Sequence, residues 1–292
     1  MNLRIIGISA ALVSAASWAV GSILFTRLGE HLSPLALTLA KGTISIVLLA
    51  IAVLLTGYQD ISREPLLLLI LSGLLGITLG DTFFFAALQN IGPHALILLL
   101  TLGEVFTVIL AVVFLGETPT PMTWGGIALV LTGVLIVLYA KISHDETSSS
   151  LRGIVLGLLS VFCMSVSLIV AKQGLADISA IQATFIRMLS GTTGIFFFGL
   201  VTQRVGLWIN PLKDFHLMKR LIISVAVITF GGFWLSLVAI KYIDVSIANT
   251  LNSTEPLFVL PLAVIFLKEK VTLSAIVGTF ITVIGIVLLC NV

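Results

Sequence analysis

Residues 94–115 read HALILLLTLGEVFTVILAVVFL, and Glu104 is the one Asp, Glu, Lys or Arg residue among them. The hydrocarbon core of a bilayer is about 30 Å thick, so a helix of roughly 20 apolar residues crosses it. A second stretch, residues 245–267, reads VSIANTLNSTEPLFVLPLAVIFL and also holds one acidic residue, Glu255, before an apolar run that ends in Phe-Leu. The two stretches therefore predict a pair of membrane-spanning helices with a common origin.

The composition of the whole chain agrees with a membrane protein. Of its 292 residues 59% are hydrophobic and 10% are charged, and the mean hydropathy is +1.22. A soluble domain carries about 25% charged residues, so this composition excludes a soluble enzyme. The net charge of +2 without a basic arm excludes nucleic acid as a partner. We expect a multi-pass protein of the plasma membrane, with the lipid bilayer as its surroundings.

Ten apolar runs are long enough to span the bilayer, which predicts an all-α membrane protein with ten transmembrane helices. Ser33-Pro34 and Gly92-Pro93 are typical of helix starts and turns between them. No small-residue cleavage site follows the first run, so it is interpreted as a membrane helix and not as a signal peptide. The predicted spans are 5–28, 34–56, 65–89, 94–115, 122–140, 152–174, 179–201, 219–240, 245–267 and 271–290.

The second half of the chain repeats the first. Ser33 and Lys41 recur 146 positions later as Ser179 and Arg187, and the later helices repeat at an offset of 151 or 152, as in Glu104 and Glu255. Chance similarity between apolar runs is the alternative. The repeat predicts two units of five helices, residues 1–143 and 150–292. Because five is odd, the second unit enters the membrane from the opposite side, as in many transporters with a binding site between inverted repeats.

Several short motifs resemble those of one transporter family. They are Trp18-x-x-Gly21, a basic residue in the second helix of each half (Lys41, Arg187), Glu255-Pro256-Leu257-Phe258, and the Phe-Leu-x-Glu ends Phe114–Glu117 and Phe266–Glu269. Over nearly its whole length the chain resembles the EamA-type branch of the drug/metabolite transporter superfamily. The resemblance implies ten helices, a substrate cavity between the halves and export of small metabolites such as amino acids. Two positions depart from the pattern: Val105, not Pro, follows Glu104, and Cys163 stands where Trp18 would repeat.

Five ionisable residues stand out because they lie away from the ends of predicted spans: Lys41, Asp81, Glu104, Arg187 and Glu255. A charge at a span centre costs at least about 2.5–3.5 kcal/mol, so each is a candidate functional residue. Glu104 and Glu255 are candidates to exchange protons or bind a cationic group of a substrate. Lys41 and Arg187 are candidates to bind a carboxylate or phosphate. The alternative is a set of buried ion pairs that fix helix register, with Asp81 paired to Lys41.

Polar residues also cluster before Pro256 in the ninth predicted helix. They are Asn249, Asn252, Ser253 and Glu255. Pro256 has no N–H, so it leaves a carbonyl near residue 252 unbonded, which is tolerated only beside protein or water. This face is therefore expected to line the cavity, with hydrogen bonding between helices as the alternative. Phe83, Phe84 and Phe85 are candidates to line a pocket, or to face lipid and neighbouring helices.

These features favour a secondary transporter that works by alternating access on a small-molecule substrate. No phosphate-binding Gly-rich motif is present, so the energy would come from a gradient, with protons as a candidate coupling ion. The histidines form no His-Glu-x-x-His pair and no Gly-x-Ser-x-Gly turn occurs, so we expect no enzyme, no metal site and no cofactor. A membrane receptor or scaffold without transport is the alternative.

The orientation in the membrane is predicted in two opposite ways. The positive-inside rule places the side richer in Lys and Arg in the cytoplasm. One side holds four such residues and the other holds nine, among them Arg27, Arg204, Lys213, Lys219 and Arg220. This count places both termini outside the cytoplasm, whereas the family resemblance implies that both are cytoplasmic.

Overall fold

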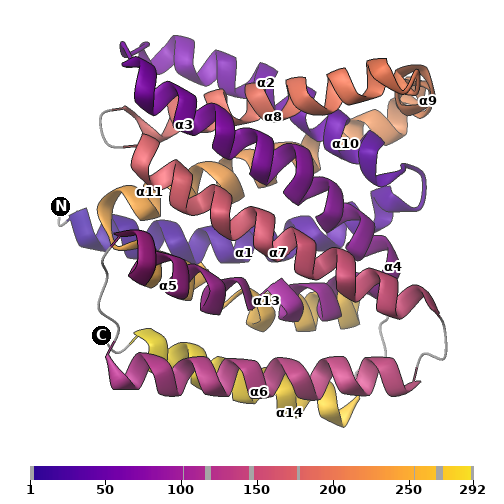
Figure 1. Cartoon of the computed structure of the whole chain (residues 1–292). Coiled ribbons are helices and arrows are strands. Elements are labelled where there is room, and N and C mark those ends of the chain that lie inside the picture. The colour runs from indigo at the N-terminus through magenta and orange to yellow at the C-terminus, as the bar shows by residue number, and fades with distance from the viewer. Residues whose placement is uncertain are drawn as a thin grey trace.

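A computed structural model describes residues 3–290 except 101, 116–119, 145–147, 176–177, 253 and 268–271. All regular structure in these residues is helical (Figure 1). The first half holds α1 (Leu3–Gly29), α2 (Pro34–Thr56), α3 (Arg63–Gly73), the π-helix η1 (Leu74–Asp81), α4 (Thr82–Leu100), α5 (Leu102–Leu115) and α6 (Pro121–His144). The second half holds α7 (Ser148–Gly174), α8 (Ala180–Val201), α9 (Val205–Ile209), the 3-10 helix η2 (Asn210–Lys213), α10 (Phe215–Ala226), the π-helix η3 (Val227–Trp234), α11 (Leu235–Tyr242), α12 (Val245–Asn252), α13 (Glu255–Leu262), the π-helix η4 (Ala263–Leu267) and α14 (Leu273–Cys290).

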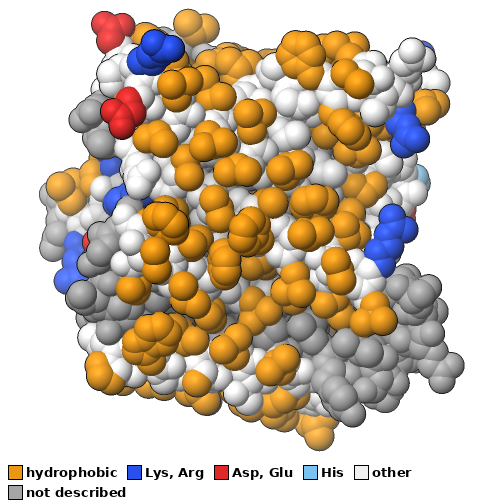
Figure 2. All heavy atoms as spheres, in the orientation of Figure 1, with side chains coloured by type: hydrophobic (Ala, Val, Ile, Leu, Met, Phe, Trp, Pro, Cys, Tyr) orange, Lys and Arg blue, Asp and Glu red, His pale blue; other side chains and the backbone are white. Residues whose placement is uncertain are grey.

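Six helical segments in the described part of the chain are long and apolar enough to cross a membrane. They are Leu3–Gly29, Pro34–Thr56, Arg63–Pro93, Leu151–Gly174, Ala180–Val201 and Phe215–Tyr242. Two shorter apolar stretches, Trp124–Gly133 in α6 and Ile276–Gly285 in α14, are also found, and the count of ten spans stays a prediction. Figure 2 shows a broad hydrophobic face whose Lys, Arg, Asp and Glu side chains gather toward two opposite edges, as expected for a protein surrounded by lipid.

The helix ends follow the signals in the sequence. The hydroxyl of Ser33 accepts a hydrogen bond from Ala36 N at the start of α2, and the hydroxyl of Ser179 accepts one from Gln182 N at the start of α8. Serine at this position satisfies a backbone N–H that has no partner within the helix. Inside α4 the backbone breaks at Gly92, with φ 77° and ψ 168°, directly before Pro93. The predicted turn between the third and fourth spans is therefore confirmed.

Wide π-helical turns interrupt the third span of each half at corresponding places. The first, η1, joins α3 to α4 and ends at Asp81, and the second, η3, joins α10 to α11 and ends at Trp234. Single π-helical turns inside α-helices are rare and occur often at functional sites. The amino-acid pattern did not predict them.

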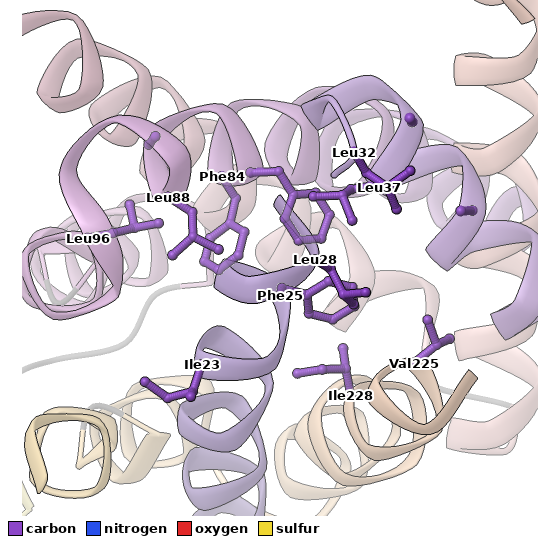
Figure 3. Close-up of a cluster of buried hydrophobic side chains, with 14 of the residues drawn as sticks. Ile23, Phe25, Leu28, Leu32, Leu37, Phe84, Leu88, Leu96, Val225 and Ile228 are labelled. Atoms are coloured by element: carbon purple, nitrogen blue, oxygen red, sulfur yellow. The ribbon is translucent and has the colours of Figure 1, made fainter. Parts of the chain in front are cut away.

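The first helix of each half packs against the other half. The first helix of each half packs along the third span of the other, α1 on η3 and α11, and α7 on α3, η1 and α4. The second helices α2 and α8 pack on each other, and so do α6 and α14, which lie side by side in Figure 1. The main hydrophobic core also includes residues of both halves. Phe25 of α1 and Phe84 of α4 come from the first half, and Val225 of α10 and Ile228 of η3 come from the second (Figure 3).

Candidate functional site

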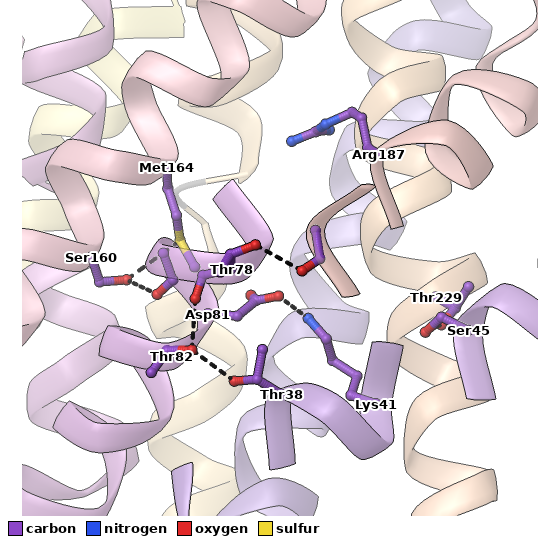
Figure 4. Close-up of polar contacts among 12 residues, drawn as sticks. Thr38, Lys41, Ser45, Thr78, Asp81, Thr82, Ser160, Met164, Arg187 and Thr229 are labelled. Carbon is purple, nitrogen blue, oxygen red and sulfur yellow. Dashed lines mark hydrogen bonds and ion pairs between the residues drawn. The ribbon is translucent and has the colours of Figure 1, made fainter. Parts of the chain in front are cut away.

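An ion pair lies inside the bundle at this interface. Lys41 of α2 donates from Nζ to the Oδ2 carboxylate oxygen of Asp81, the last residue of η1 (Figure 4). Each residue is only 1% exposed. Removing two charges from water is costly, and mutual attraction offsets the cost only when the pair is well formed. Lys41 and Asp81, both singled out from the sequence, are thus brought into direct contact, in the pairing that was the structural alternative for Asp81.

Aromatic rings from both halves surround the ammonium of Lys41. Its Nζ lies 4.4 Å from the ring centroid of Phe233 in η3 and 5.8 Å from that of Phe85 in α4. A cation within about 6 Å of an aromatic face is attracted to the ring. Trp18 of α1 packs edge-on against Phe233, with ring centroids 4.8 Å apart. The cation is therefore enclosed by rings that belong to different halves of the chain.

A narrow cavity lies beside the ion pair. Its lining is Trp18, Gly21, Ser22, Phe25, Lys41, Asp81, Phe84, Phe85 and Ile228. The space open to a water-sized sphere is about 10 Å³, which is about the room that one water molecule needs. Phe83, Phe84 and Phe85 are candidates from the sequence either for a pocket lining or for contact with lipid and neighbouring helices, and two of them, Phe84 and Phe85, line this cavity. In this conformation the ion pair is enclosed, with room for about one water molecule beside it.

Arg187 lies near the pair, on α8. It is 8% exposed, its Nη2 donates to the hydroxyl of Ser167 at 3.0 Å, and its charge interacts with that of Asp81. Its Nε has no hydrogen-bond partner among the described residues. Ser167 in turn exchanges hydrogen bonds with Ser72 of α3. Of the two basic residues matched by the repeat, Lys41 thus contacts Asp81 directly, while Arg187 contacts Ser167.

The remaining candidates lie elsewhere or outside the described part. The side chains of Glu104 and Asn249 are not described, nor is Ser253. Asn252 ends α12 and Glu255 begins α13, so the helix is interrupted just before Pro256 as predicted. The Oδ1 atom of Asn252 is buried without a hydrogen-bond partner among the described residues. No described contact joins Asn252 or Glu255 to the Lys41–Asp81 pair.

Sequence reasoning missed several polar contacts between the halves. The hydroxyl of Thr229 in η3 lies 2.7 Å from that of Ser45 in α2. The corresponding residue of η1, Thr78, donates to the carbonyl of Gly191 in α8 at 2.7 Å. Thr78 and Thr229 are 151 positions apart in the sequence, the offset of the repeat, and that offset was the available signal. Among the described residues, no three His, Cys, Asp or Glu side chains gather to bind a metal ion.

Comparison with known proteins identifies similar chains. Residues 5–139 and 151–291 each match the EamA-like transporter family. An uncharacterized transporter of Archaeoglobus fulgidus is 21% identical over 232 residues, which cover 78% of this chain and 77% of the relative. A solved structure described only as the crystal structure of a protein superposes with a TM-score of 0.70 at 18% identity, covering 100% of this chain and 99% of that one. This last likeness shows the fold alone.

Proposed function

The chain belongs to the EamA-like transporter family, and from this premise we propose that it is a secondary transporter that exports a small metabolite such as an amino acid. Family membership makes it a multi-pass transporter of the plasma membrane. The finer elements of the proposal are ten spans in two inverted repeats, residues 1–143 and 150–292, with alternating access between them. Protons are the proposed coupling ion.

The reciprocal packing of the halves supports the inverted repeat. Each first helix packs on the third span of the other half, and the matched residues Thr78 and Thr229 each make a hydrogen bond to the second helix of the opposite half. Two matched units that meet around one site can rock in two opposite senses. Each sense opens the site to one side of the membrane, which is what alternating access requires.

The buried ion pair at the interface is the observation that carries the proposal. Lys41 and Asp81 border a cavity whose walls come from both halves, since Trp18 and Phe85 belong to the first and Ile228 to the second. Ionisable residues inside a membrane are rare and mark substrate or ion pathways. Movement of one half against the other would therefore change access to both charges.

A zwitterionic amino acid has the charges that this pair can exchange. Its carboxylate can take the place of Asp81 beside Lys41, while its ammonium group takes the place of Lys41 beside Asp81. No buried charge is then left without a partner, which is the condition for stable burial of ions. Arg187 is a second candidate donor for the carboxylate, because its buried guanidinium lies near the pair and its Nε has no hydrogen-bond partner among the described residues. Phe85 and Phe233 would attract a cationic group of the substrate.

Counterflow in liposomes tests the function. Protein reconstituted in vesicles loaded with unlabelled amino acids should accumulate labelled amino acids from outside. The double variant Lys41→Met/Asp81→Asn, which removes both charges together, should stay folded and lose this flux. Ser14→Ala, which removes the hydrogen bonds from α1 to Gly232 of η3 and Ser236 of α11 without changing a charge, is the control and should keep it.

Two outcomes would overturn the proposal. Unchanged flux in the double variant would place the pathway away from Lys41 and Asp81. No counterflow for any amino acid, nucleobase or sugar derivative tested would favour a receptor or scaffold, an alternative that the narrow cavity of this conformation also fits.

A further inference from the structure

A groove that is separate from the central cavity runs between the end of α1 and the start of α10. It consists of two hollows of about 310 Å³ and 360 Å³ that share His31, Leu217 and Arg220. The first is lined mainly by apolar side chains with basic residues among them: Leu24, Arg27, Leu28, His31, Leu217, Arg220, Ile223 and Ser224. The second is polar and is lined by His31, Pro211, Asp214, His216, Leu217 and Arg220. The groove thus has an apolar part that continues into a basic part.

The order of residues along both helices produces this division. Residues three or four apart lie on one helix face. On α1, Leu24 therefore shares a face with Arg27 and Leu28, and Leu24 lies a turn deeper in the helix. On α10, Arg220 shares a face with Ile223 in the same way. Each helix contributes one guanidinium and an apolar side chain to the groove.

Asp214, the acidic residue in the lining of the groove, already accepts hydrogen bonds from the backbone. The Oδ1 atom of Asp214 accepts hydrogen bonds from the backbone N–H groups of His216 at 2.8 Å and Leu217 at 3.4 Å, at the start of α10. These two N–H groups lower the pKa of the Asp214 carboxyl, which stays ionised as a helix cap. Arg27 donates to the backbone carbonyl of Phe266, and a guanidinium has five N–H donors, so it can bind an anion in addition.

The surroundings of the groove belong to the membrane surface. Residues 202–220 contain four basic residues, Arg204, Lys213, Lys219 and Arg220, against the single acidic Asp214. Large apolar side chains beside them are exposed, with Leu207 at 71% and Phe215 at 75%. Exposed apolar side chains next to basic ones are typical of a segment lying in the headgroup region of a bilayer.

We propose that this groove binds an anionic phospholipid. The phosphate lies between Arg27 and Arg220 beside His31, and an acyl chain follows Leu24, Leu28 and Ile223 toward the membrane interior. Guanidinium groups bind phosphate oxygens in pairs of charge-assisted hydrogen bonds. An inorganic phosphate ion would occupy only the basic end and leave the apolar wall uncovered, so the groove matches a lipid better than a free anion.

The position of the lipid connects it to the moving parts of the protein. The groove joins a helix of the first half to one of the second. The same α1 walls the central cavity through Trp18 and Phe25, and α10 continues into η3, which supplies Ile228. A bound lipid therefore bridges the two halves. Its binding depends on the groove alone and holds whichever substrate is transported.

Native mass spectrometry of the full-length protein in detergent tests the proposal. Dioleoylphosphatidylglycerol, the anionic probe, should remain bound as one preferred copy, and dioleoylphosphatidylcholine should bind at least about tenfold more weakly. Arg220→Gln should reduce phosphatidylglycerol binding by about tenfold, the effect of one charge-assisted contact. Arg204→Gln removes the same charge from the same segment outside the groove and should bind the lipid as the parent does.

A further variant tests the apolar part of the groove separately. Ile223 is 53% exposed, so Ile223→Trp can fill the acyl path without disturbing the core, and it should weaken phosphatidylglycerol binding at an unchanged melting temperature. Equal binding of the two lipids, or unchanged binding in both Arg220→Gln and Ile223→Trp, would overturn the proposal. Complete displacement of the lipid by inorganic phosphate at equal concentration would also overturn it, because the site would then recognise the anion alone.

Discussion

Breaking the Lys41–Asp81 pair one residue at a time should cost far more stability than removing both charges. Asp81→Asn leaves the ammonium of Lys41 buried at 1% exposure, with the rings of Phe85 and Phe233 as weak partners. Lys41→Met likewise leaves the carboxylate of Asp81 buried without the lysine ammonium as its partner. Removing one partner of a buried pair typically destabilises a protein by about 3–5 kcal/mol, whereas replacing the whole pair is often close to neutral.

Thermal unfolding of the purified protein in detergent, followed by tryptophan fluorescence, measures these differences. A loss of 1 kcal/mol shifts the melting temperature by about 2–4 °C in chains of 150–250 residues, so a loss of about 3–5 kcal/mol should make each single variant melt roughly 6–20 °C lower. The double variant should melt above either single one, which gives a favourable coupling energy between the two residues. Lys213→Met, at an exposed position, is the control and should change stability by less than about 0.5 kcal/mol.

Two results would refute the reasoning. If both single variants melt within a degree or two of the parent, the two charges are solvated in the folded protein and are not a buried pair. If the double variant loses the sum of the two single losses, Lys41 and Asp81 act independently, because contacting residues should not be additive.

Three further predictions concern other parts of the chain. Glu255→Gln should leave the protein folded and abolish proton-coupled flux, and unimpaired flux in that variant would exclude Glu255 as the proton carrier. Gly92→Ala should destabilise the protein by about 1–3 kcal/mol in thermal unfolding, because φ 77° with ψ 168° is a conformation for glycine alone; Gly125→Ala, where an added Cβ meets no atom within 4 Å, should be neutral or slightly stabilising, and equal effects would contradict this explanation. Asp214→Ala should lower the melting temperature at neutral pH. Backbone N–H groups lower the pKa of Asp214 below its ordinary value of about 3.9. The carboxylate therefore stabilises the protein above the ordinary pKa, and this stabilisation is lost as the pH falls through the lowered pKa. An equal difference in melting temperature between variant and parent at pH 7 and at pH 2 would contradict this prediction.

The apolar runs predicted the course of the helices well because length and helix-end signals decide it. The predicted span 34–56 is α2, and the predicted start at Ser179 is the cap of α8. Proline and serine act locally at such positions, so no knowledge of packing is needed to recognise them. The helix interruption before Pro256 has a local cause as well, because proline has no N–H with which to bond a carbonyl of the preceding turn.

The arrangement of the site was only partly predictable. Lys41, Asp81 and Arg187 stand out because a charge in an apolar run is unusual, but which of them touch depends on how each helix is rotated. A helix that is apolar nearly all round gives no stripe from which rotation can be inferred. The wide turns η1 and η3, which place Asp81 and Phe233, left no local pattern in the sequence. The contact between Arg187 and Ser167 likewise depends on how α8 lies relative to α7.

The packing of the first helix of each half on the other half also constrains how the protein is synthesised and assembled in the membrane. In the folded protein α1 packs on η3, α11 and α13, which all belong to the second half. When the ribosome has completed only the first half, these packing partners of α1 do not yet exist. Lys41 and Asp81, in contrast, both belong to the first half, so their charges can neutralise each other in the nascent protein before Arg187 is made. Membrane insertion can thus proceed without an unpaired Lys41 or Asp81, while final assembly around α1 waits for the second half.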